Sequence, residues 1–187
     1  MDDRGTTPAL ERFQGYLRLV AGAHLHPLVQ RKLDPSDVVQ QTLLQAVQRW
    51  DQFRGQSDAE LAAWLRTILM RTLANAVRDL KRQKRDLGRE RSLDAALDQS
   101  SARLDAWKVA EEQSSPSERA ERDEQLLRLA QALARLPDAQ RQAVTLHHLH
   151  HWTLEDVAGH LGLTQAAVAG LIKRGLKQLR VQLQDRP

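Results

Sequence analysis

Residues 153–180 read TLEDVAGHLGLTQAAVAGLIKRGLKQLR, and this stretch decides the fold of the C-terminal part of the chain. Its first four residues have the Thr-x-x-acid pattern that caps the start of a helix. Gly162 lies in a short turn ending at Thr164, and apolar residues at helical spacing then continue to Arg180. Two helices joined by a tight glycine-containing turn predict a helix-turn-helix.

The helix predicted after this turn has two different sides. The side expected toward the core carries Val168, Leu171, Ile172 and Leu176. The other side begins with small and amide side chains and continues with cations, where phosphates would pass. No acidic residue lies between Lys173 and Arg180, which favours nucleic-acid contact over an ordinary helical hairpin. The predicted DNA-binding residues of this helix are Gln165, Ala166, Lys173, Arg174 and Lys177.

Composition limits the remaining possibilities. The chain has 187 residues, of which 41% are hydrophobic and 28% charged, and it has no cysteine, which excludes disulfides and thiolate metal sites. No run of 18 apolar residues occurs and the first residues carry no apolar stretch, so we expect a cytoplasmic protein without a membrane span. Few aromatic residues and abundant Ala, Leu, Gln, Arg and Glu predict an all-α fold.

Charge divides the chain into three parts. Residues 66–91 contain nine basic and three acidic side chains, whereas residues 92–118 contain six acidic and two basic ones. We therefore expect a helical domain over 1–91, a flexible acidic linker over 92–117 and a helix-turn-helix domain over 118–187. Within the linker, only a short helical piece around Trp107 is expected.

The N-terminal part predicts a helix over about 8–32, irregular at Pro27, and a second helix that ends near Trp50. Asp34 and Pro35 have the pattern of an N-cap followed by the first helical residue. Apolar residues of the second helix recur on one face, expected inward: Val38, Val39, Leu43, Ala46, Val47 and Trp50. The opposite face carries polar residues and one leucine: Asp37, Gln40, Gln41, Leu44, Gln45 and Gln48.

A third helix is predicted from the capping box at Ser57 to at least Arg85. One of its faces carries a basic and amide stripe: Arg71, Asn75, Arg78, Arg82, Arg85 and Arg89. A charge run is often only a solvated face, but here it shares that face with Trp64, which favours nucleic-acid contact. Trp64 itself is equally compatible with a core position.

Signs of catalysis are few. The sequence has no glycine-rich phosphate loop, no Gly-x-Ser-x-Gly elbow and no His-Glu-x-x-His motif, so we expect neither an enzyme nor a bound cofactor. Four histidines cluster over residues 147–151, but helix-end and surface roles are favoured over a metal site, because no cysteine accompanies them.

These residues resemble the extracytoplasmic-function (ECF) sigma factors, the small two-domain branch of the sigma-70 family. The resemblance rests on motifs that are weak one by one but occur in the family's order. They are DPSDVVQQTLL at 34–44, FRG at 53–55, AWLRTI at 63–68, LP at 136–137, QR at 140–141, and the segments 153–158 and 168–180. The family commonly has a glycine where His151 stands.

The resemblance implies a transcription initiation factor whose partners are core RNA polymerase and promoter DNA. The sequence leaves open whether an anti-sigma factor is a further partner. The resemblance also implies that Asp37, Gln40, Gln41 and Leu44 face the clamp helices of the largest polymerase subunit, and that the flap of the second-largest subunit is also bound. Trp64, Arg71, Asn75 and Arg78, with the loop that carries Arg54, would meet the upstream element where melting begins. The helix from Gln165 would enter the major groove of the more distant element.

An alternative function is compatible with the same residues. An autonomous helix-turn-helix repressor or activator would use the N-terminal domain to dimerise or to sense a ligand. It would bind an operator without polymerase, so the dependence of DNA binding on polymerase separates the two hypotheses. A nucleic-acid-processing enzyme with a helical DNA-binding tail is disfavoured, because the acid, metal and nucleophile groupings that it needs are missing.

Overall fold

The computed structural model of the chain describes residues 10–87 and 91–184, with side chains except at 84–87 and 91. No strand occurs in these ranges, and the predicted all-α fold is confirmed. The helices are α2 (Gln14–His24), α3 (Pro27–Gln30), α4 (Pro35–Gln48), the 3₁₀ turn η1 (Trp50–Gln52), α5 (Asp58–Leu87), α6 (Arg91–Gln113), α7 (Pro116–Ala134), α8 (Asp138–Val144), the π-helical turn η2 (Thr145–Leu149), α9 (Leu154–Leu161) and α10 (Gln165–Gln184).

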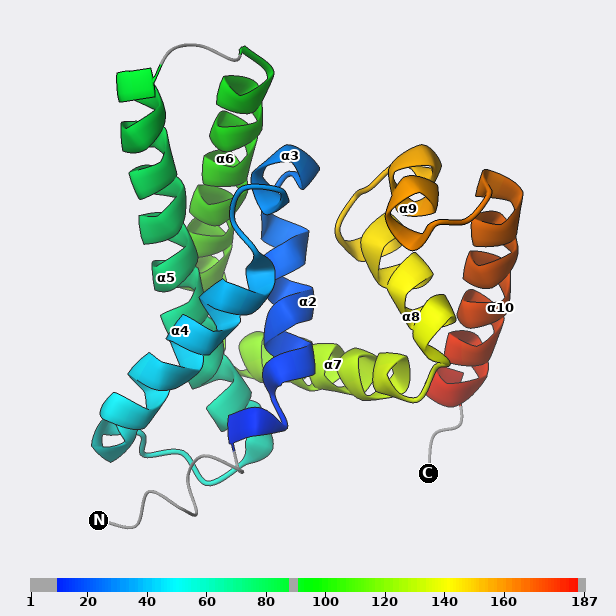
Figure 1. Ribbon diagram of the computed structural model, residues 1–187. Helices are drawn as coiled ribbons and strands as arrows, with labels where there is room; N and C mark the ends of the chain where they lie inside the picture. Colours follow the sequence, from blue (N-terminus) through cyan, green and yellow to red (C-terminus); the bar gives the residue numbers. More distant parts are fainter. Residues whose placement is uncertain (1–9, 88–90, 185–187) are drawn as a thin grey trace.

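The helices form two groups joined by α7 (Figure 1). In the N-terminal group α2, α4 and α5 pack on one another, with α6 alongside α5 and the start of α7 against α2 and α5. Its centre is aliphatic, with Leu17, Leu65 and Leu69 completely buried. In the C-terminal group α8, α9 and α10 pack around a smaller core that includes Val157 and Val168.

Local signals determine where α4 begins. The Asp34 side chain accepts a hydrogen bond from the Ser36 backbone N–H at 2.7 Å, and Pro35 occupies the first helical position. Both features match the pattern expected from the sequence. The inward face is also as expected, because Val38, Val39 and Ala46 are buried.

The helix predicted over 8–32 is interrupted. The chain leaves helical geometry at Leu25, and α3 starts at Pro27. The His26 Nδ1 atom caps α3 by accepting the Leu28 backbone N–H at 3.2 Å. The His26 backbone N–H donates to the Ser100 hydroxyl of α6 at 3.0 Å, so the break is held by a helix distant in sequence.

The segment expected to be a linker is instead mostly helix α6. Leu93, Leu97 and Leu104 recur at helical spacing and are buried against the N-terminal group. Ser115 then starts α7 with a capping box, in which its hydroxyl accepts the Glu118 N–H and the Glu118 carboxylate accepts the Ser115 N–H. The prediction of a flexible segment with only a short helical piece is therefore wrong for the residues of α6.

A buried polar cluster anchors α6 and α7 to the N-terminal group. Arg66 of α5 is 2% exposed and lies 3.1 Å from Asp123 of α7 and from Glu111 of α6. The Tyr16 hydroxyl donates to Asp123 at 3.2 Å, and the guanidinium lies 5.7 Å from the centre of the Trp107 ring. Burial raises the pKa of Tyr16, and it raises the pKa of Asp123 against the opposing charge of Arg66. Removing one partner of such a buried pair costs about 3–5 kcal/mol.

The predicted helix-turn-helix is present as α9, a turn and α10. Gly162 has φ 65°, the left-handed conformation that favours glycine, and so allows the turn. The expected core side of α10 is right for Val168 and Ile172 but wrong for Leu176, which is exposed. Gly175 is buried in its place. Glycine suits this position because α10 passes close to α8, where a Cβ atom on residue 175 would lie 2.8 Å from a methyl of Val144.

None of the helices within residues 10–87 and 91–184 combines the length and apolar character needed to span a bilayer.

Candidate functional site

The exposed side of α4 carries the predicted protein-binding set. Asp37, Gln40, Gln41 and Leu44 are all exposed, and Leu44 leaves 52% of its surface open to solvent. We call these four residues the α4 face. Beneath it, the Gln45 amide donates to the Thr72 hydroxyl of α5 at 3.4 Å and helps to fix α4 on its neighbour. The face therefore joins an exposed leucine to amide and acidic groups on a rigid helix, a combination suited to binding another protein.

An aromatic cluster closes the loop between α4 and α5. Trp50, Phe53 and Trp64 lie with ring centres 5.4–6.2 Å apart, all half-buried. Gly55 is required beside them, because a Cβ atom there would lie 2.6 Å from the Phe53 ring. The predicted contact Arg54 is exposed in this loop, whereas Trp64 contributes to local packing and keeps only part of its indole accessible.

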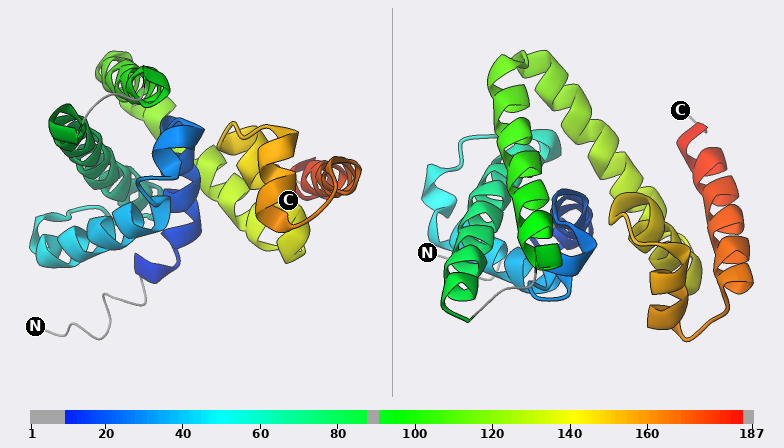
Figure 2. Two further views of the ribbon diagram at one scale, coloured as in Figure 1. Left: turned by 45° about the horizontal axis from the view of Figure 1, so that its top comes forward. Right: turned by 90° about the horizontal axis from the view of Figure 1, so that it is seen from above.

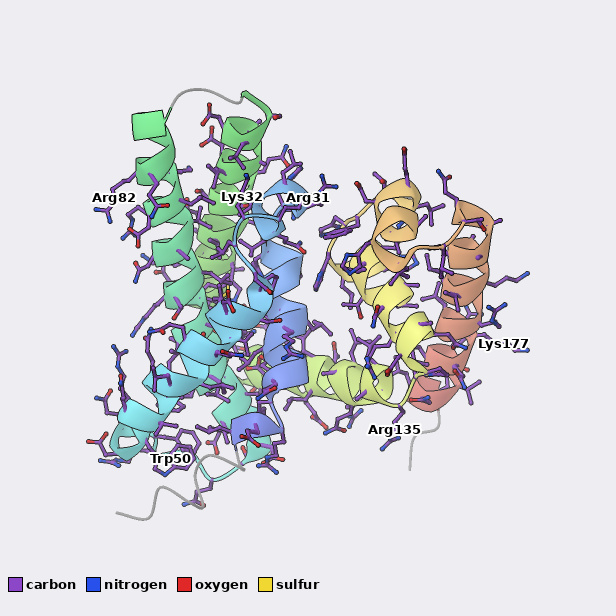
Figure 3. All side chains as sticks on the ribbon, in the orientation of Figure 1. Arg31, Lys32, Trp50, Arg82, Arg135 and Lys177 are labelled. Atoms are coloured by element: carbon purple, nitrogen blue, oxygen red, sulfur yellow. The ribbon has the colours of Figure 1, made fainter. Side chains whose placement is uncertain are left out.

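The basic stripe of α5 is exposed where the structure describes it. Arg71, Asn75, Arg78 and Arg82 all face solvent, and we call them the α5 stripe. Arg78 donates to the Asn75 side-chain oxygen at 3.2 Å, and Arg82 pairs with Asp79. Arg82 points away from the body of the molecule (Figure 3). Of the two other residues predicted for this stripe, Arg89 lies outside the described residues and the side chain of Arg85 is not described.

A groove borders the α5 stripe. Arg71 and Arg78 line one side of it, and Trp107, Lys108 and Glu112 of α6 line the other, around a volume of about 520 Å³. An acidic residue therefore lies across the groove from the cations that were predicted to contact nucleic acid.

The C-terminal candidate surface is the outer side of α10. The Thr153 hydroxyl caps α9 by accepting the Asp156 N–H at 3.1 Å, and the Thr164 hydroxyl caps α10 by accepting the Ala167 N–H at 3.2 Å. These caps determine where both helices start. The side of α10 that carries Val168 and Ile172 packs into the core, which leaves the other side open. The predicted DNA-binding residues Gln165, Ala166, Lys173, Arg174 and Lys177 are all exposed.

The histidine cluster has structural partners. His147 Nδ1 hydrogen-bonds to the Trp152 carbonyl at 2.8 Å, and His150 is buried against α2. Among the described residues, no group of three or more His, Asp or Glu side chains is arranged to hold a metal ion.

Comparison with known proteins places both surfaces in one family. The sigma-70 region 2 family matches residues 12–83, and the sigma-70 region 4 family matches residues 126–179. The chain belongs to the sigma-70 family. Region 2 covers α2 to α5 with the α4 face and the α5 stripe, and region 4 covers the end of α7 through most of α10 with the helix-turn-helix. The resemblance seen in the sequence is thus confirmed.

Curated relatives point to the ECF branch of the sigma-70 family. ECF RNA polymerase sigma factor SigG of Mycobacterium tuberculosis, strains CDC 1551 / Oshkosh and ATCC 25618 / H37Rv, is 28% identical over 165 residues. These residues make up 84% of this chain and 44% of the relatives, so the chain spans less than half the length of the curated proteins that it matches.

Sequence reasoning missed two buried polar residues that hold distant helices together. Arg66 counted as part of a basic block, although it is buried, and Gln30 received no role, although it contacts region 4. The sequence did indicate that Arg66 is buried. It lies between Leu65 and Ile68, which are buried, and on a different face of α5 from the α5 stripe. Gln30 offered no such signal, since its partners are more than a hundred residues away in the sequence.

Proposed function

We propose that this chain is an ECF-type transcription initiation factor. It binds core RNA polymerase, directs it to promoters and helps to open the duplex by holding single-stranded DNA, without catalysing a reaction. The α4 face contacts the clamp helices of the largest polymerase subunit. The α5 stripe, with Arg54 and Trp64, contacts the upstream element where melting begins, and the exposed side of α10 enters the major groove of the more distant element.

The observation that carries this proposal is the match to sigma-70 regions 2 and 4 in that order on one chain. The exposure of the predicted surfaces supports it. Leu44 of the α4 face is 52% exposed, and exposed cations lie along both α5 and α10. Cations on phosphates supply affinity with little sequence preference, which suits a factor whose register on DNA is also set by polymerase.

A binding titration against bacterial core RNA polymerase tests the proposal. We expect saturable one-to-one binding at physiological salt, followed by size exclusion or fluorescence anisotropy. Changing Gln40→Ala together with Leu44→Ala should weaken binding at least tenfold, because it removes an exposed apolar contact and an amide from the α4 face. The helix should keep its fold, since neither side chain is buried.

A matched variant on another helix serves as the control. Gln99 and Val109 of α6 are also an exposed amide and an exposed aliphatic residue, and Val109 is 50% exposed. Gln99→Ala with Val109→Ala should leave polymerase affinity within about twofold of the parent. Equal affinity of the two double variants would contradict the role of the α4 face. Failure of the parent chain to bind polymerase, with tight operator-like DNA binding by the chain alone, would favour the autonomous repressor or activator instead.

A further inference from the structure

A cleft lies where α2, α5, α6 and α7 meet. Helices α6 and α7 diverge from the turn that joins them, and α2 lies between them (Figure 2). The cleft has a volume of about 630 Å³, within the usual range for sites that bind small molecules. None of its lining residues belongs to the α4 face or the α5 stripe. We call it the arginine cleft, because Arg66, Arg103 and Arg122 line it.

Cations outnumber carboxylates at the arginine cleft. Arg66 pairs with Asp123 and Glu111, each at 3.1 Å, and Arg122 shares Glu111 at 3.5 Å. Arg103 forms no ion pair with any residue that the structure describes, and its guanidinium donates to a backbone carbonyl at 3.5 Å. Three arginines therefore face two carboxylates, which leaves one positive charge without a carboxylate partner in the described part of the chain.

The charges of the arginine cleft act on His24, which also lines it. Burial lowers the pKa of His24, and the charges of Arg103 and Arg66 lower it further, while the hydrogen bond to the Val20 carbonyl opposes the shift. Because these two arginines repel a positive charge at this place, they attract a negative charge there. The arginine cleft is therefore suited to an anion.

Two buried N–H donors of the arginine cleft lack acceptors. Arg66 is 2% exposed, and its Nε has no hydrogen-bond partner among the described residues. The indole Nε1 of Trp107 is also buried and has no partner in the same part of the chain. Both groups are donors only, and a buried donor without an acceptor is unfavourable. A ligand carboxylate is an acceptor of the kind that both groups lack.

The rest of the lining is apolar. It includes Leu19 and Val20 of α2 and Leu126 of α7. On α6 the lining residues Ala106 and Ala110 lie one helical turn apart, and their short side chains leave space between the helices. An inorganic anion would leave this apolar wall uncovered, whereas an anion with an apolar tail would cover it.

We propose that the arginine cleft binds an amphipathic monocarboxylate, a small molecule with one carboxylate and an apolar tail. The carboxylate lies against Arg103 and supplies acceptors to Arg66 and Trp107, and the tail covers the apolar lining. A single negative charge is expected, because a single cation lacks a carboxylate partner. This site is separate from the surfaces proposed for polymerase and promoter DNA, so it stands or falls independently of them.

A ligand-detected NMR titration of the full chain with octanoate tests the proposal. Octanamide has nearly the same tail without the charge, and acetate has the charge without the tail. We expect saturable one-to-one binding of octanoate, and about tenfold or more weaker binding of octanamide and acetate. Absence of octanoate binding, or equal affinity for either of the other two ligands, would overturn the proposal.

The unpaired cation is tested by Arg103→Gln. This change should weaken octanoate binding about fivefold or more, because it removes the charge that the carboxylate neutralises. Arg128→Gln is the matched control, since Arg128 is an exposed arginine of α7 that does not line the cleft. It should leave the affinity within about twofold of the parent. Equal affinities of the two variants would remove Arg103 from the site and contradict the proposed charge balance.

A second pair of variants tests the location of the site. Ala110→Leu fills the arginine cleft from α6 and should weaken octanoate binding about tenfold or more. The chain should still fold, because the parent side chain is exposed. Ala102→Leu is the control on the same helix, exposed and outside the cleft. Octanoate should raise the unfolding temperature of Ala102→Leu but not that of Ala110→Leu. The same affinity and the same temperature shift in both variants would place octanoate elsewhere and overturn the proposal.

Discussion

At the scale of single residues, His151 has a conformation that its side chain disfavours. Its φ is 60°, in the left-handed region, two residues after the end of the π-helical turn η2. A residue other than glycine in this region costs about 1–2 kcal/mol, because Cβ crowds the following carbonyl oxygen. The position is one at which ECF factors commonly carry glycine, and the observed φ supplies the physical reason. The turn it makes directs Trp152 back toward α3.

Replacing His151 should therefore stabilise the chain. His151→Gly should raise the free energy of unfolding by about 0.5–1 kcal/mol, less than the full strain because glycine also gains freedom in the unfolded chain. Urea unfolding followed by circular dichroism measures the change. The control is His148→Gly in η2, where the side chain is likewise exposed but φ is helical, and which should lower stability by about 1 kcal/mol. A loss of stability in both variants would show that His151 is not strained.

The burial of Arg66 and Asp123 could not be predicted from their charge alone. Arg66 and Asp123 look like ordinary surface charges, yet they form a buried pair completed by the Tyr16 hydroxyl. Burial of an arginine depends on the partner that meets it, and this partner lies on a helix 57 positions later. An ion pair between residues this far apart in the sequence leaves no local pattern. The only signal in the sequence is that Arg66 lies among apolar residues, between Leu65 and Ile68, which the structure shows to be buried.

At the scale of elements, the boundaries set by local chemistry were predictable. The caps at Asp34 and Thr153 act within three residues, so their sequence pattern is nearly the whole cause of the helix start. The exposed faces of α4 and α5 followed from helical periodicity in the same way. Their exposure agrees with the predicted sites, whose binding roles remain predictions.

Helix α6 is the element that the sequence analysis predicted wrongly, as a flexible linker. Its acidic and small residues suggested a solvated connector, although Leu93, Leu97 and Leu104 recur at helical spacing. The helix forms because tertiary packing gives this narrow apolar stripe a surface to cover. The exposed pair between Lys81 of α5 and Asp98, at 2.9 Å, adds little to that packing. Weighing composition above periodicity led to the wrong prediction.

The α5 stripe carries a prediction of its own. Reversing the charge of Arg78 and Arg82 by substitution to Glu should abolish promoter opening, because both cations face solvent along the proposed path of single-stranded DNA. Polymerase binding should be preserved, since the α4 face is untouched. Permanganate reactivity of unpaired thymines in a polymerase–promoter complex measures opening.

A charge-matched variant separates the α5 stripe from net charge. Arg128 and Arg135 of the α7 region are exposed as well, and reversing both changes the total charge by the same amount. Opening should survive this change within a factor of about two. Equal loss in both double variants would assign the effect to overall electrostatics, and unimpaired opening after the α5 change would remove the stripe from the mechanism.

At the scale of the whole molecule, the two sigma-70 regions share one continuous core. Val144 and Leu179 of region 4 belong to the same buried cluster as the leucines of α2 and α5, and Leu133 of α7 is a further member. Apolar burial therefore accompanies the hydrogen bonds of Gln30 to His150 and Trp152. His150 is buried here as well, and burial lowers its pKa from 6.5 to about 4, while the Arg18 backbone opposes and His151 adds to that shift.

Acid should destabilise the folded chain through His150. Because burial lowers the pKa of His150, the folded chain binds this proton less well than the unfolded chain does, so this contribution to stability is present above pH 6.5 and is lost as pH falls toward 4. Between pH 7.5 and 5.5 the free energy of unfolding should fall by about 1.4 kcal/mol, measured by urea unfolding. Burial lowers the pKa of His24, His26 and His148 as well, so His150→Ala is the control. It should flatten the pH response, whereas an unchanged response would assign the effect to groups other than His150.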